Sequence, residues 1–149
     1  MSDNIKLRPV TIEDADLLLE WRNDIQTRMA SHNTKKVEKN EHICWLKRSL
    51  DNPSRILLIA EKDGMPVGVV RADYSDGVYE LSWTVAPKAR GIGIGKKMVA
   101  LLAKQITAPI RAEIKVGNKA SISIAEYVGM KHERKNNGVL YYRRLELKR

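Results

Sequence analysis

Three glycines within five positions form a short segment that could bind a phosphate group. The segment reads Arg90-Gly91-Ile92-Gly93-Ile94-Gly95-Lys96-Lys97. It lies between a predicted strand and a predicted helix. Glycine lets the backbone approach a ligand closely, and the N–H groups of a helix's first turn attract anions. Arg90, Lys96 and Lys97 would add mobile positive charge at the same place, so the segment predicts a seat for a pyrophosphate.

The spacing of these glycines excludes the two common nucleotide-binding loops. A nucleoside-triphosphate loop needs a glycine five residues before Gly95, where the chain has Arg90. It also needs Ser or Thr directly after Lys96, where the chain has Lys97. A dinucleotide loop needs a glycine three residues after Gly93, and this position is Lys96. A different phosphate-bearing ligand is therefore expected.

Hydrophobic periodicity and turn signals indicate the elements that hold this segment. The first half of the chain predicts a strand at 5–10, helices at 12–21 and 36–50, and strands at 55–61 and 66–74. The helix at 36–50 is expected to turn Ile43, Leu46 and Leu50 inward. The second half predicts strands at 78–86, 110–116, 130–133 and 139–145, a helix after Gly95 and a short helix at 119–127. Tight turns are predicted at Asp63-Gly64, Asp76-Gly77 and Asn137-Gly138. Without a repeat or linker, this pattern predicts one mixed α/β domain over residues 1–149.

The glycine segment fits the pattern Arg/Gln-x-x-Gly-x-Gly, which is the coenzyme A pyrophosphate motif of the GNAT superfamily of N-acetyltransferases. The sequence resembles this family over nearly its whole length. Asn118 and Ser121 stand at the strand–helix junction where the family has a cofactor-contacting Asn, followed by Glu126-Tyr127-Val128-Gly129-Met130 in place of the usual Glu-Lys-x-Gly-Phe. The resemblance implies an α/β (α+β) fold: a mostly antiparallel mixed sheet of about seven strands, splayed between the fourth and fifth, with about four helices.

The resemblance also implies acetyl-CoA as co-substrate and a set of residues that bind it. The backbone of Thr84 and Val85 would pair with the pantetheine arm in the splay. The pyrophosphate would be held by Arg90, Gly91, Ile92, Gly93, Ile94, Gly95 and Lys96, with Asn118 and Ser121 completing the cofactor site.

Acetyl transfer to an amine needs a base, because an ammonium with a pKa near ~10 must lose a proton first. Glu80 lies in the fourth predicted strand on the same face as Ser82 and Thr84, and many relatives carry a glutamate there. The alternative is that Glu80 is a solvated charge paired with Arg71 of the neighbouring strand. His42 and Asp73 are the reserve candidates for the base.

The oxyanion of the intermediate could be stabilised by the backbone N–H near Val85. Many relatives use a tyrosine as the acid for the leaving thiolate, but this chain has Ala125 at that position. Tyr127 would point to a different side of its helix and does not take over the role. A coenzyme A thiolate is a tolerable leaving group, so a dedicated acid is not required.

The acceptor site is expected in the N-terminal half. Trp-Arg-Asn at 21–23, His-x-x-Trp at 42–45 and Gly-x-x-Arg-x-Asp at 68–73 resemble GNAT enzymes that acetylate nucleotide-linked amino sugars in pseudaminic and related nonulosonic acid pathways. The substrate-binding residues that this implies are Trp21, Arg22, Asn23, His42, Arg71 and Asp73. Taken singly, the tryptophans could be core or rim residues and His42 a surface histidine. Only their combination favours a sugar site, with the amine at the 4-position.

The net charge of +9 is unevenly distributed and leaves other functions open. Residues 1–85 carry 12 Lys/Arg and 14 Asp/Glu, whereas residues 86–149 carry 15 and 4. The basic half would attract a phosphorylated small molecule or nucleic acid. The basic C-terminal residues are Lys131, Arg134, Lys135, Arg143, Arg144, Lys148 and Arg149. The alternatives are a protein N-terminal or ribosomal-protein acetyltransferase, a basic nucleic-acid-binding module and a non-catalytic coenzyme A sensor.

Composition also bears on the solubility of the protein, its cellular location and its capacity to bind a metal. With 43% hydrophobic and 30% charged residues, the chain can bury a core and remain soluble. It has no run near the ~18 apolar residues of a membrane span, and Asp3 stands where a signal peptide would carry Lys or Arg. Its single cysteine and three histidines have no metal-ligand spacing. We expect a cytoplasmic monomer or homodimer that binds a small-molecule amine and no metal, membrane or nucleic acid.

Overall fold

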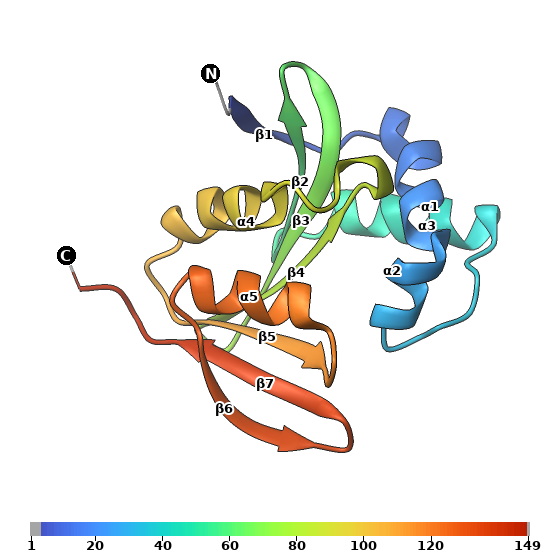
Figure 1. Ribbon diagram of the computed structural model, residues 1–149. Helices are drawn as coiled ribbons and strands as arrows, with labels where there is room; N and C mark the ends of the chain where they lie inside the picture. Colours follow the sequence, from blue (N-terminus) through green and yellow to red (C-terminus); the bar gives the residue numbers. More distant parts are fainter. Residues whose placement is uncertain (1–3, 149) are drawn as a thin grey trace.

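The computed structural model describes residues 4–148, so Asp3 and Arg149 lie outside the described residues. Seven strands form one mixed sheet in the order β1-β2-β3-β4-β5-β7-β6 (Figure 1). The strands are β1 Ile5–Pro9, β2 Arg55–Lys62, β3 Met65–Ser75, β4 Val78–Val85, β5 Ile110–Lys115, β6 Lys131–Asn136 and β7 Val139–Arg144. Every neighbouring pair is antiparallel except β4 and β5, which are parallel. The predicted sheet is therefore confirmed.

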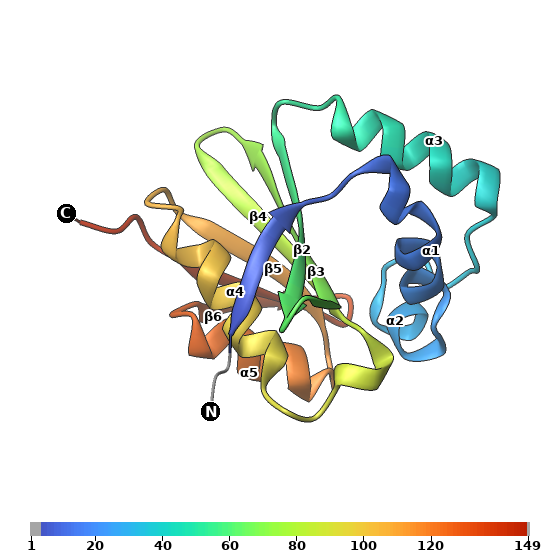
Figure 2. The same cartoon turned by 90° about the horizontal axis from the view of Figure 1, so that it is seen from above.

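Helices lie on both faces of the sheet. They are α1 Ala15–Asn23, α2 Ile25–Ala30, α3 Lys39–Leu50, α4 Ile94–Lys104 and α5 Lys119–Tyr127, with short 3-10 turns at Ile12–Asp14 and Pro87–Ala89. Figure 2 shows α4 and α5 on one side of the sheet and α1, α2 and α3 gathered on the other. None of the helices within residues 4–148 has the length and apolar character needed to cross a lipid bilayer.

The predicted splay lies between β4 and β5. These strands pair only at Tyr79 with Ile110 and at Glu80 with Arg111. The backbone N–H of Tyr79 donates toward β5, to the carbonyl of Pro109. Farther along β4, the alternation of a strand turns the N–H and C=O groups of every second residue toward the gap. The sheet therefore opens into a gap along one side of β4.

The direction of these backbone groups follows from the two ends of β4. Ala86 N–H donates to Val67 O at 2.8 Å, so even-numbered positions turn their backbone toward β3. The odd-numbered residues Trp83 and Val85 consequently present their backbone groups to the gap. Of the two residues expected to pair with the pantetheine arm, Val85 faces the gap, whereas the backbone of Thr84 is directed toward β3.

Tight packing under β4 holds α4 in place. Met98, Val99 and Leu102 of α4 are buried and face the sheet. At Gly68 in β3, an added Cβ would lie 2.5 Å from Met98 Sδ and 2.9 Å from Thr84 O. Because no side chain larger than hydrogen fits there, α4 approaches the sheet closely and fixes the start of the helix next to β4.

Two expectations about the N-terminal helices are wrong. Helix α3 begins at Lys39 rather than near residue 36, and it turns His42, Leu46 and Ser49 inward. Leu50, predicted to face the core, is 41% exposed. Polar residues take the buried face because each finds a partner, as buried polar groups require. Helix α2 was not predicted at all.

Candidate active site

A cleft of about 1070 Å³ occupies the splay and continues toward α1, α2 and α3. One part is lined by β4, the glycine segment and α5, and the other by α1, α2, α3 and the loop after α2. Among the predicted cofactor residues, all except Ile92 line this cleft, and Ile92 is 59% exposed. The structure therefore brings the predicted cofactor and acceptor regions into one continuous space.

The glycines of the segment have different roles. Gly91 and Gly93 both have a φ of 81°, which L-residues with a side chain rarely adopt. A Cβ at either position would meet nothing within 4 Å, so the space beside both is open. At Gly95 a Cβ would lie 2.5 Å from Ile124 Cδ1, and this glycine lets α4 pack against α5. The open backbone and the first N–H groups of α4 can receive a phosphate.

Arg90, predicted to add mobile charge for a pyrophosphate, lines the cleft, but its guanidinium is held by three side chains. Its Nη2 donates to Asp24 Oδ2 at 2.7 Å and to Thr27 Oγ1 at 3.1 Å. Its Nη1 donates to Gln26 Oε1 at 2.8 Å. Asp24 caps α2, and Gln26 and Thr27 lie in the first turn of this helix, which was not predicted. The guanidinium is therefore held by the acceptor side of the cleft.

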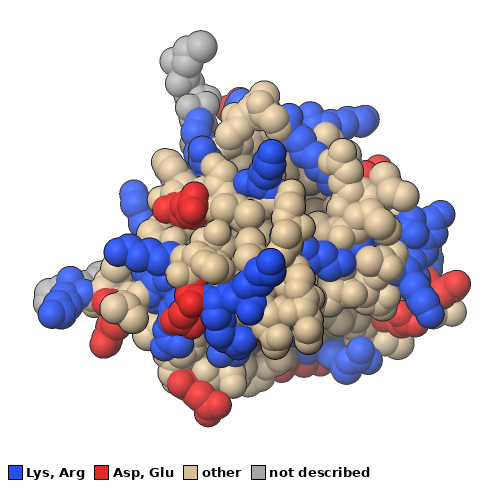
Figure 3. Space-filling view, turned by 60° about the horizontal axis from the view of Figure 1, so that its bottom comes forward, with Lys and Arg blue, Asp and Glu red and all other residues tan. Residues whose placement is uncertain are grey.

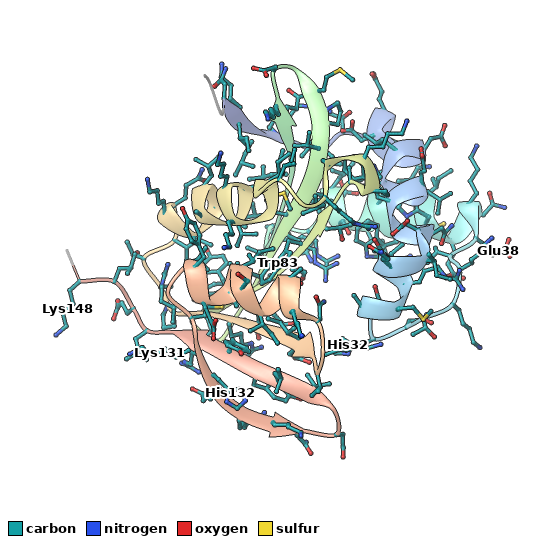
Figure 4. The ribbon with its side chains drawn as sticks, viewed as in Figure 1. His32, Glu38, Trp83, Lys131, His132 and Lys148 are labelled. Atoms are coloured by element: carbon teal, nitrogen blue, oxygen red, sulfur yellow. The ribbon has the colours of Figure 1, made fainter. Side chains whose placement is uncertain are left out.

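The predicted cofactor residues after β5 hold the start of α5. Asn118 Oδ1 accepts a hydrogen bond from Ser121 N–H and caps the helix. Ser121 Oγ in turn accepts a hydrogen bond from Trp83 Nε1 at 3.2 Å. This bond crosses the splay from α5 to β4, and Figure 4 shows Trp83 between these elements. The two walls of the cleft are thus joined by side chains where their backbones separate.

Glu80, the predicted base, lines the cleft and is one third exposed. Its Oε1 accepts a hydrogen bond from Arg111 Nε at 3.2 Å. The register of β3 and β4 sets Asp73 opposite Glu80, and the direct ion-pair partner of Arg71 is Asp73. Arg71 is nevertheless a charged neighbour of Glu80. Burial, the largest influence, lowers the pKa of the Arg71 guanidinium, and the carboxylate of Glu80 acts in the opposite direction.

Asp73, a reserve base and predicted sugar ligand, is enclosed by two guanidinium groups. Its Oδ1 accepts from Arg55 Nε at 2.6 Å, and Arg71 Nε lies 3.1 Å from its Oδ2. Asp73 does not line the cleft, whereas Arg71 does. The carboxylate of Asp73 therefore holds Arg71 in position from behind.

His42 is buried, so the expectation of an ordinary surface histidine does not hold. It is 4% exposed, and its Nε2–H donates to the carbonyl of Ala15 at 3.0 Å. The ring stacks on Trp45 with 5.6 Å between centroids. Burial, the largest influence, lowers the pKa of His42 below its ordinary value, and the charge of Arg22 acts in the same direction. The neutral imidazole forms part of the cleft wall and joins α3 to α1.

Of the predicted Trp-Arg-Asn group at the end of α1, Trp21 and Arg22 line the cleft and Asn23 does not. Trp21 is also a core residue, 4% exposed. The side-chain amide of Asn23 donates to Val37 O and accepts from Val37 N–H, which pins the loop before α3.

Arg22 lines the acceptor part of the cleft with an unsatisfied donor. Its Nη2 donates to the carbonyl of Asn33 at 2.8 Å. Its Nη1 is buried and has no hydrogen-bond partner among residues 4–148. Burial, together with the charge of Arg28, lowers the pKa of this guanidinium. A buried donor without a partner is costly, so this group is suited to an anionic ligand.

The segment around α2 contains functional candidates that the sequence analysis missed. His32 Nε2 lies 3.2 Å from Glu113 Oε1 of β5, and both residues line the cleft (Figure 4). Lys115 Nζ donates to the carbonyl of Met29 at 3.0 Å. These contacts join the segment to the far wall of the splay. No motif links residues so far apart in the sequence, so no sequence signal could have found them.

Comparisons with known proteins agree with this arrangement. The structure is similar to spermidine N-acetyltransferase from Vibrio cholerae, solved with coenzyme A and spermine, with a TM-score of 0.84, 14% identity and 97% of each chain covered. A domain from Methanocaldococcus jannaschii has a TM-score of 0.84 and 22% identity, with 95% of this chain and 98% of that chain covered. An aminoglycoside acetyltransferase solved with coenzyme A has a TM-score of 0.80 and 20% identity, with 95% of each chain covered.

At these identities the likeness shows the fold alone, a mixed sheet splayed between β4 and β5 with helices on both faces. A family model described as an acetyltransferase (GNAT) domain matches residues 4–131. The chain belongs to this family and is a GNAT acetyltransferase. No curated protein sequence matches it. Within residues 4–148, no three His, Cys, Asp or Glu side chains are grouped as metal ligands would be.

The burial of His42 predicts a loss of stability in acid. The folded protein keeps His42 neutral where the unfolded chain already binds a proton, near the ordinary pKa of ~6.5. The unfolded state then holds more protons, so acidification below about pH 6.5 favours unfolding. Urea unfolding of wild type and His42→Gln between pH 7 and pH 5 should show a smaller loss of stability in the variant. His132→Gln, at an exposed histidine of β6, serves as the control. Parallel pH curves for wild type and His42→Gln would contradict this account.

Proposed function

We propose that the protein transfers an acetyl group from acetyl-CoA directly to a primary amine of a small molecule. The observation that carries this proposal is the unpaired backbone of β4, which leads from Glu80 past Val85 toward the glycine segment. A pantetheine arm placed along this edge would replace the missing strand partner. Its pyrophosphate would then reach Gly91, Gly93 and the first turn of α4. The thioester would lie on the acceptor side of the cleft.

The reaction needs a neutral amine and a donor for the developing oxyanion. Glu80, directly or through water, takes a proton from the ammonium. The amine nitrogen attacks the thioester carbonyl, the C–N bond forms, and Val85 N–H donates to the oxyanion. The nitrogen, which still carries one proton more than an amide, gives that proton to water as the C–S bond breaks, and the electron pair of that bond leaves with the coenzyme A sulfur. Ala125, at the position of the family tyrosine, is completely buried and offers no proton, so the thiolate is protonated by water.

The role of Glu80 predicts a specific loss of turnover. Glu80→Gln keeps the shape of the side chain and removes the base, so kcat at pH 7 should fall by about 10²-fold while coenzyme A binding is retained. Product mass and thiol release measure the rate. Glu133→Gln, at an exposed glutamate of β6, should leave kcat unchanged. An unaltered kcat in Glu80→Gln would remove Glu80 as the base.

The phosphate seat predicts a loss of cofactor affinity in Gly93→Ala. The added Cβ would occupy the open space beside a φ of 81°, where the pyrophosphate is proposed to lie. The Kd for coenzyme A, measured by calorimetry, should rise by about tenfold, equivalent to ~1.4 kcal/mol. Gly138→Ala places the same kind of strain, at a φ of 78°, in the β6–β7 turn and is the matched control. Equal affinities in the two variants would contradict the proposed seat.

For the acceptor we propose an amine that also carries phosphate, such as the 4-amino group of a nucleotide-linked amino sugar. Arg22, Arg48 and Arg71 line the acceptor part of the cleft, and Arg22 Nη1 is an unsatisfied buried donor. Guanidinium groups bind phosphate with paired hydrogen bonds. Glu41, Glu80 and Glu113 line the same cleft, and their carboxylates suit the amine end of such an acceptor.

Two of the basic C-terminal residues have partners within the fold, which argues against the nucleic-acid alternative. Arg144 is used inside the fold, where its Nη2 donates to the carbonyls of Ile106 and Ala108 at 2.7 and 2.8 Å. Arg134 lies over the ring of Tyr141, 3.8 Å from its centroid. On the face shown in Figure 3, Lys and Arg are interspersed with acidic and uncharged residues. No continuous basic stripe covers that face.

The acceptor is tested by incubating the protein with acetyl-CoA and, separately, a UDP-linked 4-amino-6-deoxy sugar, spermine and peptides with free N-termini. The expected result is one acetyl group added to the sugar, detected by product mass. Arg22→Gln should raise the KM for the sugar by about tenfold with a smaller change in kcat, because one charged hydrogen bond is lost. Arg134→Gln is the control. Acetylation of peptides alone would favour the N-terminal alternative, and coenzyme A binding without any turnover would favour a sensor.

A further inference from the structure

We propose that Arg90 is a positioning residue that couples the glycine segment to the acceptor side of the cleft. The motif assigns this arginine to the pyrophosphate, but its guanidinium lies on the first turn of α2 instead. The proposal rests on the proposed binding of coenzyme A at the glycine segment. In this proposal the partner of Arg90 is Asp24 at the start of α2, and the measurable effect is on the stability of α2.

The contacts of Arg90 form a paired, partly buried charge interaction. The side chains of Arg90 and Asp24 are 29% and 19% exposed, and their closest atoms are 2.7 Å apart. Asp24 also caps α2, because its Oδ2 accepts from Thr27 N–H at 3.2 Å. One carboxylate thus starts the helix and holds the arginine. Moving Arg90 to a phosphate would leave the partly buried Asp24 without its cation, at a cost.

Helix α2 depends on such contacts for its position. It has six residues and none of them is buried. A helix of this length is unstable by itself, and α2 has no apolar face in the core to compensate. It is held by Arg90 at its first turn and by Lys115 at Met29 near its end. Three of its residues, Gln26, Thr27 and Ala30, line the cleft. The acceptor wall at α2 is therefore placed by polar bonds to the cofactor side.

The bond between Arg90 and Asp24 can couple the two sides of the cleft because Arg90 is next to the glycines in the chain. Arg90 directly precedes Gly91, whose open backbone is part of the proposed phosphate seat. When a pyrophosphate orders residues 91–93, it also fixes the base of the Arg90 side chain and, through it, the first turn of α2. Coenzyme A then stabilises the acceptor wall without touching it. By thermodynamic linkage, an acceptor that orders α2 strengthens coenzyme A binding by the same factor.

Hydrogen exchange of the α2 amides tests this coupling without knowledge of the acceptor. In wild type, saturating coenzyme A should slow exchange in residues 25–30 by about fivefold, the lower end of typical coupling energies. In Arg90→Gln and in Asp24→Asn this slowing should be lost. The Kd for coenzyme A should change by less than about threefold in both variants. This is less than the coupling of about fivefold and less than the change expected if a charged contact with phosphate were lost. Asn is as good a helix cap as Asp, so Asp24→Asn removes the charge and keeps the helix start.

Lys88→Gln, at an exposed lysine of the neighbouring 3-10 turn, is the matched control and should behave as wild type. Two results would overturn the proposal. One is a coenzyme A Kd raised by about tenfold or more in Arg90→Gln with the α2 response retained, which would make Arg90 a phosphate ligand. The other is the same α2 response to coenzyme A in all variants. If wild type itself fails to bind coenzyme A, the proposed cofactor site fails, which is a separate outcome.

Discussion

The two residue pairs that join β4 to β5 are the constraint on which the cleft depends. Tyr79 with Ile110 and Glu80 with Arg111 keep seven strands in one sheet. With further pairs the gap would close, and without these two the sheet would divide. Backbone groups left unpaired along β4 need hydrogen-bond partners, and a ligand or water can supply them. Because β4 lacks pairing with β5 beyond these two residues, its backbone groups on that side are available to bind a ligand.

Side chains take over where the backbone pairing stops. The bond from Trp83 to Ser121 spans the gap at α5, while Arg90 and Lys115 tie α2 to opposite walls. Each of these links joins residues at least 38 positions apart. They are polar and partly exposed, so their strength varies with solvent and ligand more than that of the packed core under α4. The architecture combines a rigid support with an acceptor wall that is held by hydrogen bonds.

Local patterns were sufficient to predict most of the sheet. Alternating strands and the turn at Asp63-Gly64, where both residues have positive φ, are properties of a few neighbouring residues. The prediction failed where partners are distant. Burial of His42 depends on the Ala15 carbonyl, and Ser49 accepts from Arg55 Nη1. Helix α2 lacks a buried face, so it produced no periodic signal. For the same reason the motif could suggest a phosphate near Arg90 but could not reveal Asp24, which lies 66 positions away.

The sheet has two open edges, and their composition affects how the molecule meets its own copies. All six residues of β6 are exposed, among them Lys131, Arg134 and Lys135. The opposite edge strand, β1, carries Lys6 and ends at Pro9, which has no N–H to offer, while its Arg8 is paired with Asp14 and Glu61. A second copy that approached β6 as an added strand would bring like charges together, and one that approached β1 would meet Lys6 and a position without an N–H donor. Both edges are thereby protected against strand-to-strand aggregation, a protection that added salt would weaken by screening.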